Sequence, residues 1–459
     1  MTRTIDTDYL VVGAGAAGMA FTDEILTHTD ATVALVDRRH APGGHWVDAY
    51  PYVRLHQPSA FYGVSSAPLG SDAIDATGLN AGFYELAGAD EIRAYYERVL
   101  TRRFLASGRV HYFPGCEYVG DGRFVSRLGA ESWQARVRKK LVDATYLEGT
   151  IPATSPPPFD IGAGVRIAHA GELTGIHARP ERYVIIGAGK TALDACVWLL
   201  EHGVPAKAIT WVKPREAWWM NRKFQQPAAL SPELFRGIAL QMDAMATSKS
   251  ADEILLRLED DGVFLRVDRT VAPTMLRGAI ISESELALLR QIENVVRMGR
   301  VRWITRTEIA MDDGTIPTDE HTLHVHCAAS GLAAPPVRPI FEPGRIRVQG
   351  IGWGFICYQY ATIAVVEATA KDDEEKNRLC QPIRYWNTGI DYLKAFLATL
   401  AGNQVRSQHP PLRAWMKSTR LNPTNVAAVH LDHPTTVEAR ETSKRLVAQV
   451  VANLSRIES

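Results

Sequence analysis

The sequence lacks the features that would tie it to a disulfide scaffold, a metal site or a nucleic acid. Only five cysteines occur in 459 residues, and no two of them form a Cys-x-x-Cys pair or a metal-ligand cluster. We therefore expect no disulfide framework, no bound metal, and a reduced, cytoplasmic setting. The 51 basic and 51 acidic residues give a formal net charge of zero. This balance argues against nucleic-acid binding and against an electrostatic membrane anchor.

Long apolar runs are also missing. No stretch approaches about 20 apolar residues, so we expect no membrane span. The first apolar run is interrupted by Gly13, Gly15 and Gly18, and it does not have the pattern of a secretory leader. The length, with 46% hydrophobic and 22% charged residues, indicates a globular protein of two or three domains.

Two glycine-rich segments, each following a β-branched apolar run, are the most informative pattern that is present. The range 9–18 reads YLVVGAGAAG, and the range 183–192 reads YVIIGAGKTA. Both match G-x-G-x-x-G/A between a strand and a helix, which is the context that dinucleotide binding requires. The glycines permit a tight turn, close approach to the pyrophosphate and close helix–strand packing, and the pyrophosphate lies at the helix N-terminus.

Two such turns predict an α/β fold with two Rossmann-like domains and two dinucleotides. The economical pair is a tightly held flavin and a nicotinamide that reduces it. The candidate cofactor-binding residues of these turns are Gly13, Gly15, Ala17 and Gly18 in the first, and Gly187, Gly189, Lys190 and Thr191 in the second.

The residues after the second strand of each unit predict which nucleotide binds where. The strand 32–36 ends at Asp37, which is followed by Arg38. Asp37 lies at about the separation from the first turn (roughly 20 residues) at which an acidic side chain reaches ribose hydroxyls. The strand 208–213 instead ends in Lys213-Pro214-Arg215, and two cations suit a 2′-phosphate. We therefore expect FAD in the first domain and NADPH in the second, unless Lys213 and Arg215 are solvated loop charges.

A proline-rich stretch at 151–159 marks a connection between domains, since its prolines cannot lie inside a helix. We expect an FAD-binding domain made of residues 1–170 and 325–459, with a mainly helical C-terminal part. An NADPH-binding domain is expected as an insertion at 180–324. Hydrophobic periodicity predicts helices over 16–26, 89–105, 191–201, 231–258, 283–296 and 356–370, and strands within 110–142 and over 301–305 and 322–327.

The chain resembles the flavin-containing monooxygenase superfamily, which includes N-hydroxylases and Baeyer–Villiger enzymes. The resemblance spans about residues 8–370. It rests on the two glycine turns, on Gly43-Gly44-His45-Trp46, on Asp143-Ala144-Thr145-Tyr146 and on Ala328-Ala329-Ser330-Gly331. It implies flavin contacts for Gly44, His45, Trp46, Ser330, Gly331 and Gly350, the last in a strand–helix junction whose helix N-terminus faces the flavin pyrimidine.

The resemblance also places the segment 50–59 beside the flavin ring. Relatives carry an Asn there, or an Asp close to an Arg, whereas this chain has Arg54, His56 and Gln57, which become the candidate catalytic residues. The sequence leaves two roles open for His56: a hydrogen-bond donor to the reacting groups, or a histidine whose hydrogen bonds are made with the protein backbone. Arg54 is a cation near the cofactors or part of a loop-closing ion pair. The linker fingerprint F-x-G-x-x-x-H is not matched in spacing, so a Baeyer–Villiger reaction is not assigned.

The resulting hypothesis is an FAD-dependent monooxygenase that consumes NADPH and forms a flavin C4a-(hydro)peroxide. It would oxygenate a small organic substrate with O₂ at nitrogen, at sulfur or beside a carbonyl. One alternative is an NAD(P)H:flavin oxidoreductase that inserts no oxygen. Another is a non-catalytic nucleotide sensor, which the intact glycines of both turns argue against. The sequence leaves the oligomeric state open, a homodimer being one option.

Overall fold

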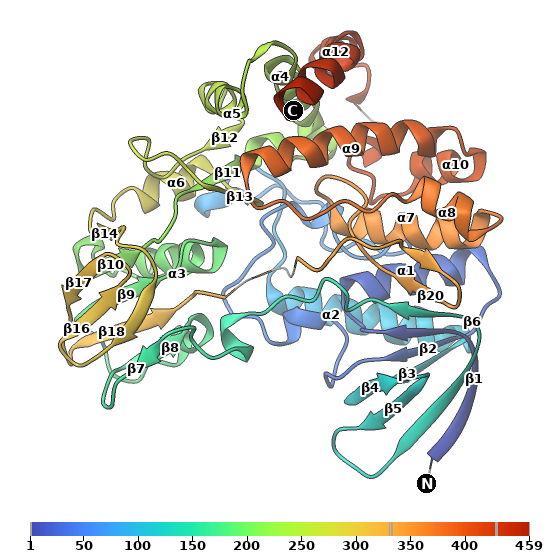
Figure 1. Cartoon of the computed structure of the whole chain (residues 1–459), viewed down its shortest axis with the longest axis horizontal. Helices are drawn as coiled ribbons and strands as arrows, with labels where there is room; N and C mark the ends of the chain where they lie inside the picture. Colours follow the sequence, from blue (N-terminus) through green and yellow to red (C-terminus); the bar gives the residue numbers. More distant parts are fainter. Residues whose placement is uncertain (1, 330, 332–333, 427–429, 459) are drawn as a thin grey trace.

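The computed structural model describes residues 2–329, 331, 334–426 and 430–458, and it consists of sheets flanked by helices (Figure 1). The apolar runs before both glycine turns lie in central strands of two separate parallel arrays. This arrangement confirms the α/β fold that the sequence predicts.

The first sheet has the strand order β19-β20-β6-β1-β2-β3, and the β4–β5 hairpin joins it through the antiparallel pairing of β5 with β6. The central strand β1 pairs in parallel with β2 and β6, so the first glycine turn leaves the sheet at its carboxyl edge. The bounds are β1 Thr2–Val12, β2 Val33–Val36, β3 Val110–Phe113, β4 Cys116–Gly120, β5 Arg123–Ser126, β6 Ser132–Asp143, β19 Phe341–Glu342 and β20 Arg345–Arg347.

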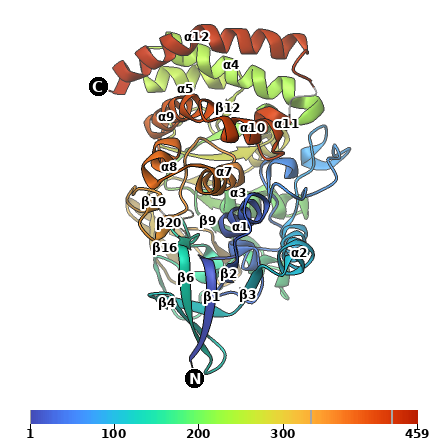
Figure 2. The same ribbon diagram turned by 90° about the vertical axis from the view of Figure 1, so that its right-hand side faces the viewer.

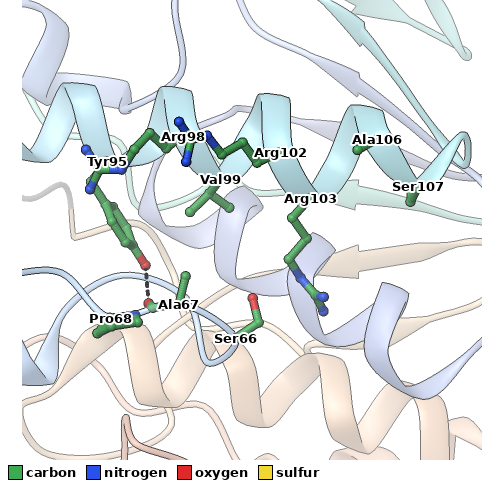
Figure 3. Close-up of a pocket in the computed structure, with 10 residues that line it drawn as sticks. All are labelled: Ser66, Ala67, Pro68, Tyr95, Arg98, Val99, Arg102, Arg103, Ala106 and Ser107. Carbon is green, nitrogen blue, oxygen red and sulfur yellow. Dashed lines mark hydrogen bonds between the residues drawn. The ribbon is translucent and has the colours of Figure 1, made fainter.

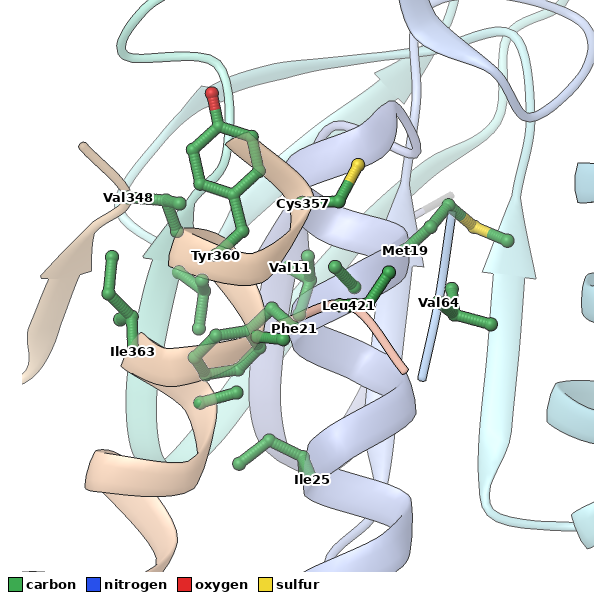
Figure 4. Packing of buried hydrophobic residues seen from close by; sticks show 14 of the residues in the cluster. Val11, Met19, Phe21, Ile25, Val64, Val348, Cys357, Tyr360, Ile363 and Leu421 are labelled. Carbon is green, nitrogen blue, oxygen red and sulfur yellow. The ribbon is translucent and has the colours of Figure 1, made fainter. Parts of the chain in front are cut away.

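Helices α1 (Ala16–His28) and α7 (Ile356–Thr369) lie side by side against this sheet, although they are far apart in sequence (Figure 4). Their shared core includes Val11 from β1, Phe21 from α1 and Ile363 from α7, each fully buried. Three such side chains contribute several kcal/mol of burial, at about 25 cal/mol per Å² of apolar surface. The packing therefore brings the N-terminus of α7 to the same end of the sheet as the glycine turn.

The second sheet has the order β14-β10-β9-β18-β8, and all of its pairs are parallel. The strand before the second glycine turn, β9, is flanked by β10 and β18. Helix α3 (Lys190–Glu201) follows the turn and buries its apolar face, including Leu193, Cys196 and Val197. The bounds are β8 Ile167–His169, β9 Arg182–Ile186, β10 Ile209–Val212, β14 Val295–Val296 and β18 Thr322–His326.

Two smaller sheets complete the second half of the molecule. One has the order β12-β11-β13, and the other has the order β17-β16-β15-β7. Their bounds are β7 Asp160–Ile161, β11 Ala217–Asn221, β12 Phe264–Leu265, β13 Met275–Ile281, β15 Val301–Ile304, β16 Glu308–Met311 and β17 Gly314–Pro317. Because β7 pairs with β15 and β8 pairs with β18, residues 160–169 join the second unit by strand pairing and not the first, where the sequence analysis put them.

The C-terminal helices connect both halves. Helix α12 (Pro434–Glu458) lies along α4 (Ser231–Thr247), and their shared core contains Met242, Met245 and Val450 (Figure 2). By contrast, Trp415 of α10 donates its indole N–H to Glu24 of α1 at 3.1 Å. The remaining helices are α2 Ala89–Val99, α5 Ala251–Asp260, α6 Glu283–Leu289, α8 Asp373–Leu379, α9 Gly389–Ser407, α10 Pro410–Ser418 and α11 Pro423–Val426.

Three predicted helices differ from the observed ones. The helix expected over 283–296 ends already at Leu289, and Val295–Val296 forms the strand β14 at the edge of the second sheet. The helix expected over 231–258 is divided, because α4 ends at Thr247 and Ser250 caps the start of α5 by accepting a hydrogen bond from the N–H of Glu253. The helix expected over 89–105 is α-helical only to Val99. It continues as a π turn over Leu100–Phe104, which hydrophobic periodicity does not resolve.

Candidate functional site

The first glycine turn has the close approaches that only glycine permits. Gly13 has φ +103°, and a Cβ on Gly18 would lie 1.8 Å from the carbonyl oxygen of Gly13. Gly15 and Gly44 face each other, and a Cβ on Gly44 would lie 2.9 Å from the Cα of Gly15. Gly15 is also the N-cap of α1 and has no side-chain cap. The turn and the Gly43-Gly44 segment therefore form one backbone cradle whose helix N-terminus is not capped by a side chain.

Asp37 lies directly beside this cradle. Its carboxylate accepts the N–H of Ala14 at 2.6 Å and the N–H of Arg39 at 2.7 Å, and the side chain is only 4% exposed. Burial raises the pKa of Asp37. Through these hydrogen bonds the carboxylate of Asp37 holds the backbone of the first glycine turn in place. Arg38 is exposed and pairs with Glu148 at 2.7 Å.

The two residues after Gly44 differ in exposure. His45 is exposed, whereas Trp46 is buried. Ala17, in the first glycine turn, is half-buried. The indole of Trp46 lies in the core and donates its N–H to the hydroxyl of Tyr62 at 2.7 Å. Trp46 therefore positions the segment from inside the domain, while Gly44 and His45 form its accessible part.

The second glycine turn is similar in form but more open. Gly187 has φ +146°, and a Cβ there would lie 3.0 Å from the carbonyl oxygen of Cys327. Gly189 is the N-cap of α3, and among the described residues no heavy atom lies within 4 Å of the position that its Cβ would take. Lys190 pairs with Asp194 one turn further along the helix, and Thr191 is half-buried. The N-terminus of α3 is therefore a second uncapped site for an anion.

At the carboxyl end of β10, the two predicted cations differ in their surroundings. Lys213 is 1% exposed and pairs with the equally buried Glu216 at 2.7 Å. Burial lowers the pKa of Lys213, and the charge of Glu216 opposes that shift. The ammonium group of Lys213 therefore points into the protein, whereas the sequence predicted an exposed cation at the end of this strand.

Arg215 is half-buried in an environment of like charge. Burial, together with the positive charges of Arg277 and Arg300, lowers the pKa of Arg215. Arg300 follows β14, which pairs in parallel with β10, so both arginines come from neighbouring carboxyl ends of the second sheet. Arg277 reaches the same region from β13, with its Nε bonded to the side-chain oxygen of Asn387 at 2.7 Å. Sequence analysis missed Arg277 and Arg300, because their proximity depends on strand order.

His56 lies where the two halves of the molecule meet. Its Nδ1 accepts the backbone N–H of Ile280 at 3.2 Å, so the ring proton is on Nε2. Burial, with the positive charges of Lys190 and Arg222, lowers the pKa of His56 to about 3. The imidazole is therefore a neutral donor held by β13. Gln57 is half-buried next to it, and Arg54 is exposed, with an isolated bridge to Gly88.

A buried charge network surrounds this histidine. Arg222 is 1% exposed, pairs with Glu285 at 2.7 Å and donates to the backbone oxygen of His56 at 3.4 Å. Lys190 lies 3.7 Å from Glu285, and Tyr50 donates its hydroxyl proton to Asp194 at 2.6 Å. Burial would raise the pKa of Glu285, but Lys190 and Arg222 outweigh that effect and lower it. Together these contacts join the segment after the first turn to the helix after the second.

An interdomain cavity of about 720 Å³ opens beside the network. The charged residues Lys190, Asp194, Arg222 and Glu285 line it from the second unit, and residues 51–55, 75–80, 86 and 88–91 line it from the first. This volume is in the range typical of small-molecule sites. Arg54 lines the cavity. His56 does not line it, but the backbone oxygen of His56 accepts a hydrogen bond from Arg222, which does.

The N-terminus of α7 has the arrangement expected of the last strand–helix junction. Phe355 is the N-cap, with φ +44° and no side-chain cap. The side-chain oxygen of Gln359 accepts the N–H groups of Ile351 and Gly352 at 2.8 and 3.0 Å, which fixes the loop that contains Gly350. Gly331 donates its N–H to Thr150 at 3.2 Å, and Ser330 lies outside the described residues.

The sequence predicted neither a metal site nor a membrane span, and both features concern the described part of the chain. No group of three or more His, Cys, Asp or Glu residues is placed there to hold a metal ion. In the same part, no helix has both the length and the apolar character that crossing a membrane requires.

The depressed pKa of His56 predicts a pH effect on stability. Because the folded-state pKa is about 3 and the ordinary value is 6.5, the unfolded chain binds a proton between these values that the folded chain does not. Stability from this group should therefore fall as the pH drops below 6.5. We expect urea unfolding to show wild type losing stability relative to His56→Gln between pH 7 and pH 5. A pH-independent difference would mean that His56 titrates normally.

Known proteins share the family and the fold of this chain. The family model for an NAD(P)-binding Rossmann-like domain matches residues 11–61. "Uncharacterized protein Rv2000" of Mycobacterium tuberculosis (strain ATCC 25618 / H37Rv) is 42% identical over 421 residues, covering 92% of this chain and 78% of the relative.

Solved structures share the fold at low identity. The polycyclic ketone monooxygenase of Thermothelomyces thermophila has a TM-score of 0.53 at 12% identity, with 99% of this chain and 89% of that one covered. A cyclohexanone monooxygenase mutant from Rhodococcus sp. Phi1, bound to NADP+, has a TM-score of 0.51 at 16% identity, with 79% and 85% covered. These values show a common fold.

Proposed function

Since the chain belongs to one family with the mycobacterial protein and has the fold of flavin monooxygenases, we propose that it is an FAD-dependent monooxygenase that consumes NADPH. The observation that carries the proposal is the pair of glycine turns at uncapped helix N-termini on two separate parallel sheets. Two pyrophosphate sites on one chain fit a flavin and a nicotinamide better than any single-nucleotide function.

The residues of the first turn fit a flavin dinucleotide. Between Gly15 and Gly44 the cradle is lined by backbone alone, and a Cβ on either glycine would fill it. Asp37 would face the ribose, and the N-terminus of α7 would stabilise negative charge on the reduced ring. When bound, the flavin supplies electron transfer and the activation of O₂.

The second turn fits a nicotinamide dinucleotide that carries a 2′-phosphate. Gly189 leaves open space at the N-terminus of α3, where the pyrophosphate would lie. Arg215 and Arg300, at neighbouring strand ends, would hold the 2′-phosphate. His56 would donate a hydrogen bond from Nε2, while Arg222 and Glu285 hold the interdomain segment and keep water from the reacting groups.

The substrate would be a small organic molecule that enters through the interdomain cavity, with one oxygen atom added at nitrogen, at sulfur or beside a carbonyl. Isotopically labelled O₂ tests this proposal. With amines, sulfides and ketones as candidates, we expect one class to show label in the product and NADPH consumption matched to product. If NADPH is consumed but only H₂O₂ accumulates with every class, the reductase alternative is correct.

We expect Arg215→Ala to weaken NADPH binding about 10-fold or more, because it removes one charge-assisted contact worth about 1.5–3 kcal/mol. NADH binding should change less than about twofold, since NADH has no 2′-phosphate. Fluorescence titration with both nucleotides measures the ratio. Lys213→Met is the comparison variant: because Lys213 is buried against Glu216, it should lower stability and leave the ratio unchanged. Equal losses of NADPH and NADH in Arg215→Ala would remove Arg215 from the 2′-phosphate site.

A further inference from the structure

A second cavity, separate from the interdomain one, lies on the outer surface of the first domain (Figure 3). It has a volume of about 530 Å³ and lies between the loop 66–68 and the face formed by the C-terminal end of α2 and the turns after it. Among the described residues that line it, three are arginines and none is acidic. We call this cavity the α2 pocket.

The π turn after α2 explains why three arginines face one cavity. At the end of Leu100–Phe104 the N–H of Leu105 donates to the carbonyl oxygen of Leu100. This hydrogen bond spans five residues, whereas those of an α-helix span four. The wider turn keeps both Arg102 and Arg103 on the side of Arg98, whereas a regular α-helix would rotate one of them away. π turns occur frequently at functional sites.

The wall opposite the helix is held rigidly by one buried carboxylate. Asp23 of α1 is fully buried and accepts the N–H of Ser66 at 3.0 Å, the hydroxyl of Ser66 at 2.5 Å and the Nε of Arg103. The hydroxyl of Tyr95 donates to the carbonyl of Ala67 at 2.8 Å. Asp23 thus neutralises Arg103, and the loop is fixed before any ligand arrives.

Arg98 and Arg102 carry the remaining charge. Both are exposed, and in the part of the chain that the structure describes neither has a carboxylate within ion-pair distance. Arg98 lies over the ring of Tyr95, with its guanidinium carbon 6.0 Å from the ring centroid. Like charges four residues apart cost a helix a few tenths of a kcal/mol. An anion between the two guanidinium groups would convert that cost into a favourable interaction.

We propose that the α2 pocket binds a phosphate monoester or a pyrophosphate group through Arg98 and Arg102, at a site independent of both dinucleotides. Guanidinium groups bind phosphate oxygens in bidentate geometry, as they do carboxylate oxygens, and two cations beside one cavity favour a phosphate with two negative charges over a carboxylate of single charge. Ser66 and Ser107 line the same cavity, but their hydroxyl protons are donated to Asp23 and to the carbonyl oxygen of Phe104, so the two arginines supply the donors for the phosphate.

Isothermal titration with pyrophosphate tests the proposal, using protein saturated with FAD and NADP⁺ so that the glycine turns are occupied. We expect millimolar affinity or better, and Arg98→Ala/Arg102→Ala should weaken it at least about 10-fold. Arg98→Lys/Arg102→Lys should retain part of the affinity, because charge remains without the bidentate geometry. The matched control is Arg93→Ala on the same helix, where Arg93 pairs with Asp90 outside the pocket.

Two outcomes would overturn the proposal. One is undetectable pyrophosphate binding at about 10 mM, an affinity too weak for two arginine contacts. The other is equal affinity in wild type and the double alanine variant when thermal melting shows both folded. Vesicles of phosphatidylcholine with phosphatidic acid distinguish the source of the group: binding to pyrophosphate alone identifies a soluble ligand, and vesicle binding lost in the same variant identifies a lipid headgroup. The titration and the vesicle assay both compare binding by wild type with binding by the variant, so neither depends on the oxygenation reaction.

Discussion

Gly189→Ala should fold normally and lose NADPH affinity by about 100-fold. No described heavy atom lies within 4 Å of the position of the new Cβ, and Gly189 lies outside the left-handed region of φ, so the free protein can accommodate a methyl group. The pyrophosphate cannot, because the second glycine of this motif is where backbone and phosphate come into contact. A displacement of about 1 Å at such a contact is enough for an effect of this size.

Affinity from fluorescence titration and melting temperature, measured on the same sample, separate the two effects. Gly175→Ala is the matched control, because Gly175 also has open space around its Cβ position but is part of neither glycine turn. It should leave affinity and melting temperature unchanged. Unaltered NADPH affinity in Gly189→Ala would mean that the dinucleotide does not lie at the N-terminus of α3.

Gly18→Ala should have the opposite profile and destabilise the first domain severely. Its Cβ would lie 1.8 Å from the carbonyl oxygen of Gly13, which directly follows β1, and 3.3 Å from the side chain of Val11 in β1. Backbone cannot yield as a flexible side chain does, so α1 must move away from β1. Overpacking of this kind costs about 3 kcal/mol or more. We expect the purified variant to be colourless, since its flavin cradle is distorted.

Urea unfolding measures the loss of stability, and the visible absorption spectrum measures flavin retention. Gly129→Ala serves as the control in the same domain, because the nearest atom to its Cβ position is 3.9 Å away. A Gly18→Ala protein that remains yellow and unfolds at the wild-type urea concentration would contradict the tight helix–strand contact described here.

The parts that the sequence could predict are those determined by neighbours in the chain. The glycine turns are local patterns, and Gly13, Gly18 and Gly187 have the positive φ or the close contacts that those patterns require. The helices after both turns begin within one residue of their predicted positions. The confirmed fold class follows from the same local signals, repeated twice.

The parts that it could not predict depend on contacts between distant segments. Lys213 was expected as a surface cation, but Glu216 and the packing around it bury the ammonium. Arg300 reaches Arg215 only because β14 pairs with β10. Likewise, the surroundings of His56 are contributed by Ile280 and Arg222, more than 160 residues away in the chain. Strand order and side-chain pairing of this kind leave no periodic signal in a single sequence.

The central claim is that one chain holds FAD on its first sheet and NADPH on its second. The most direct test is to mix the FAD-loaded protein with NADPH in the absence of oxygen and follow the visible absorption. We predict that the flavin bands bleach fully, and more slowly with NADH at the same concentration. A protein that takes up no FAD, or whose yellow colour persists in excess NADPH, would contradict the claim.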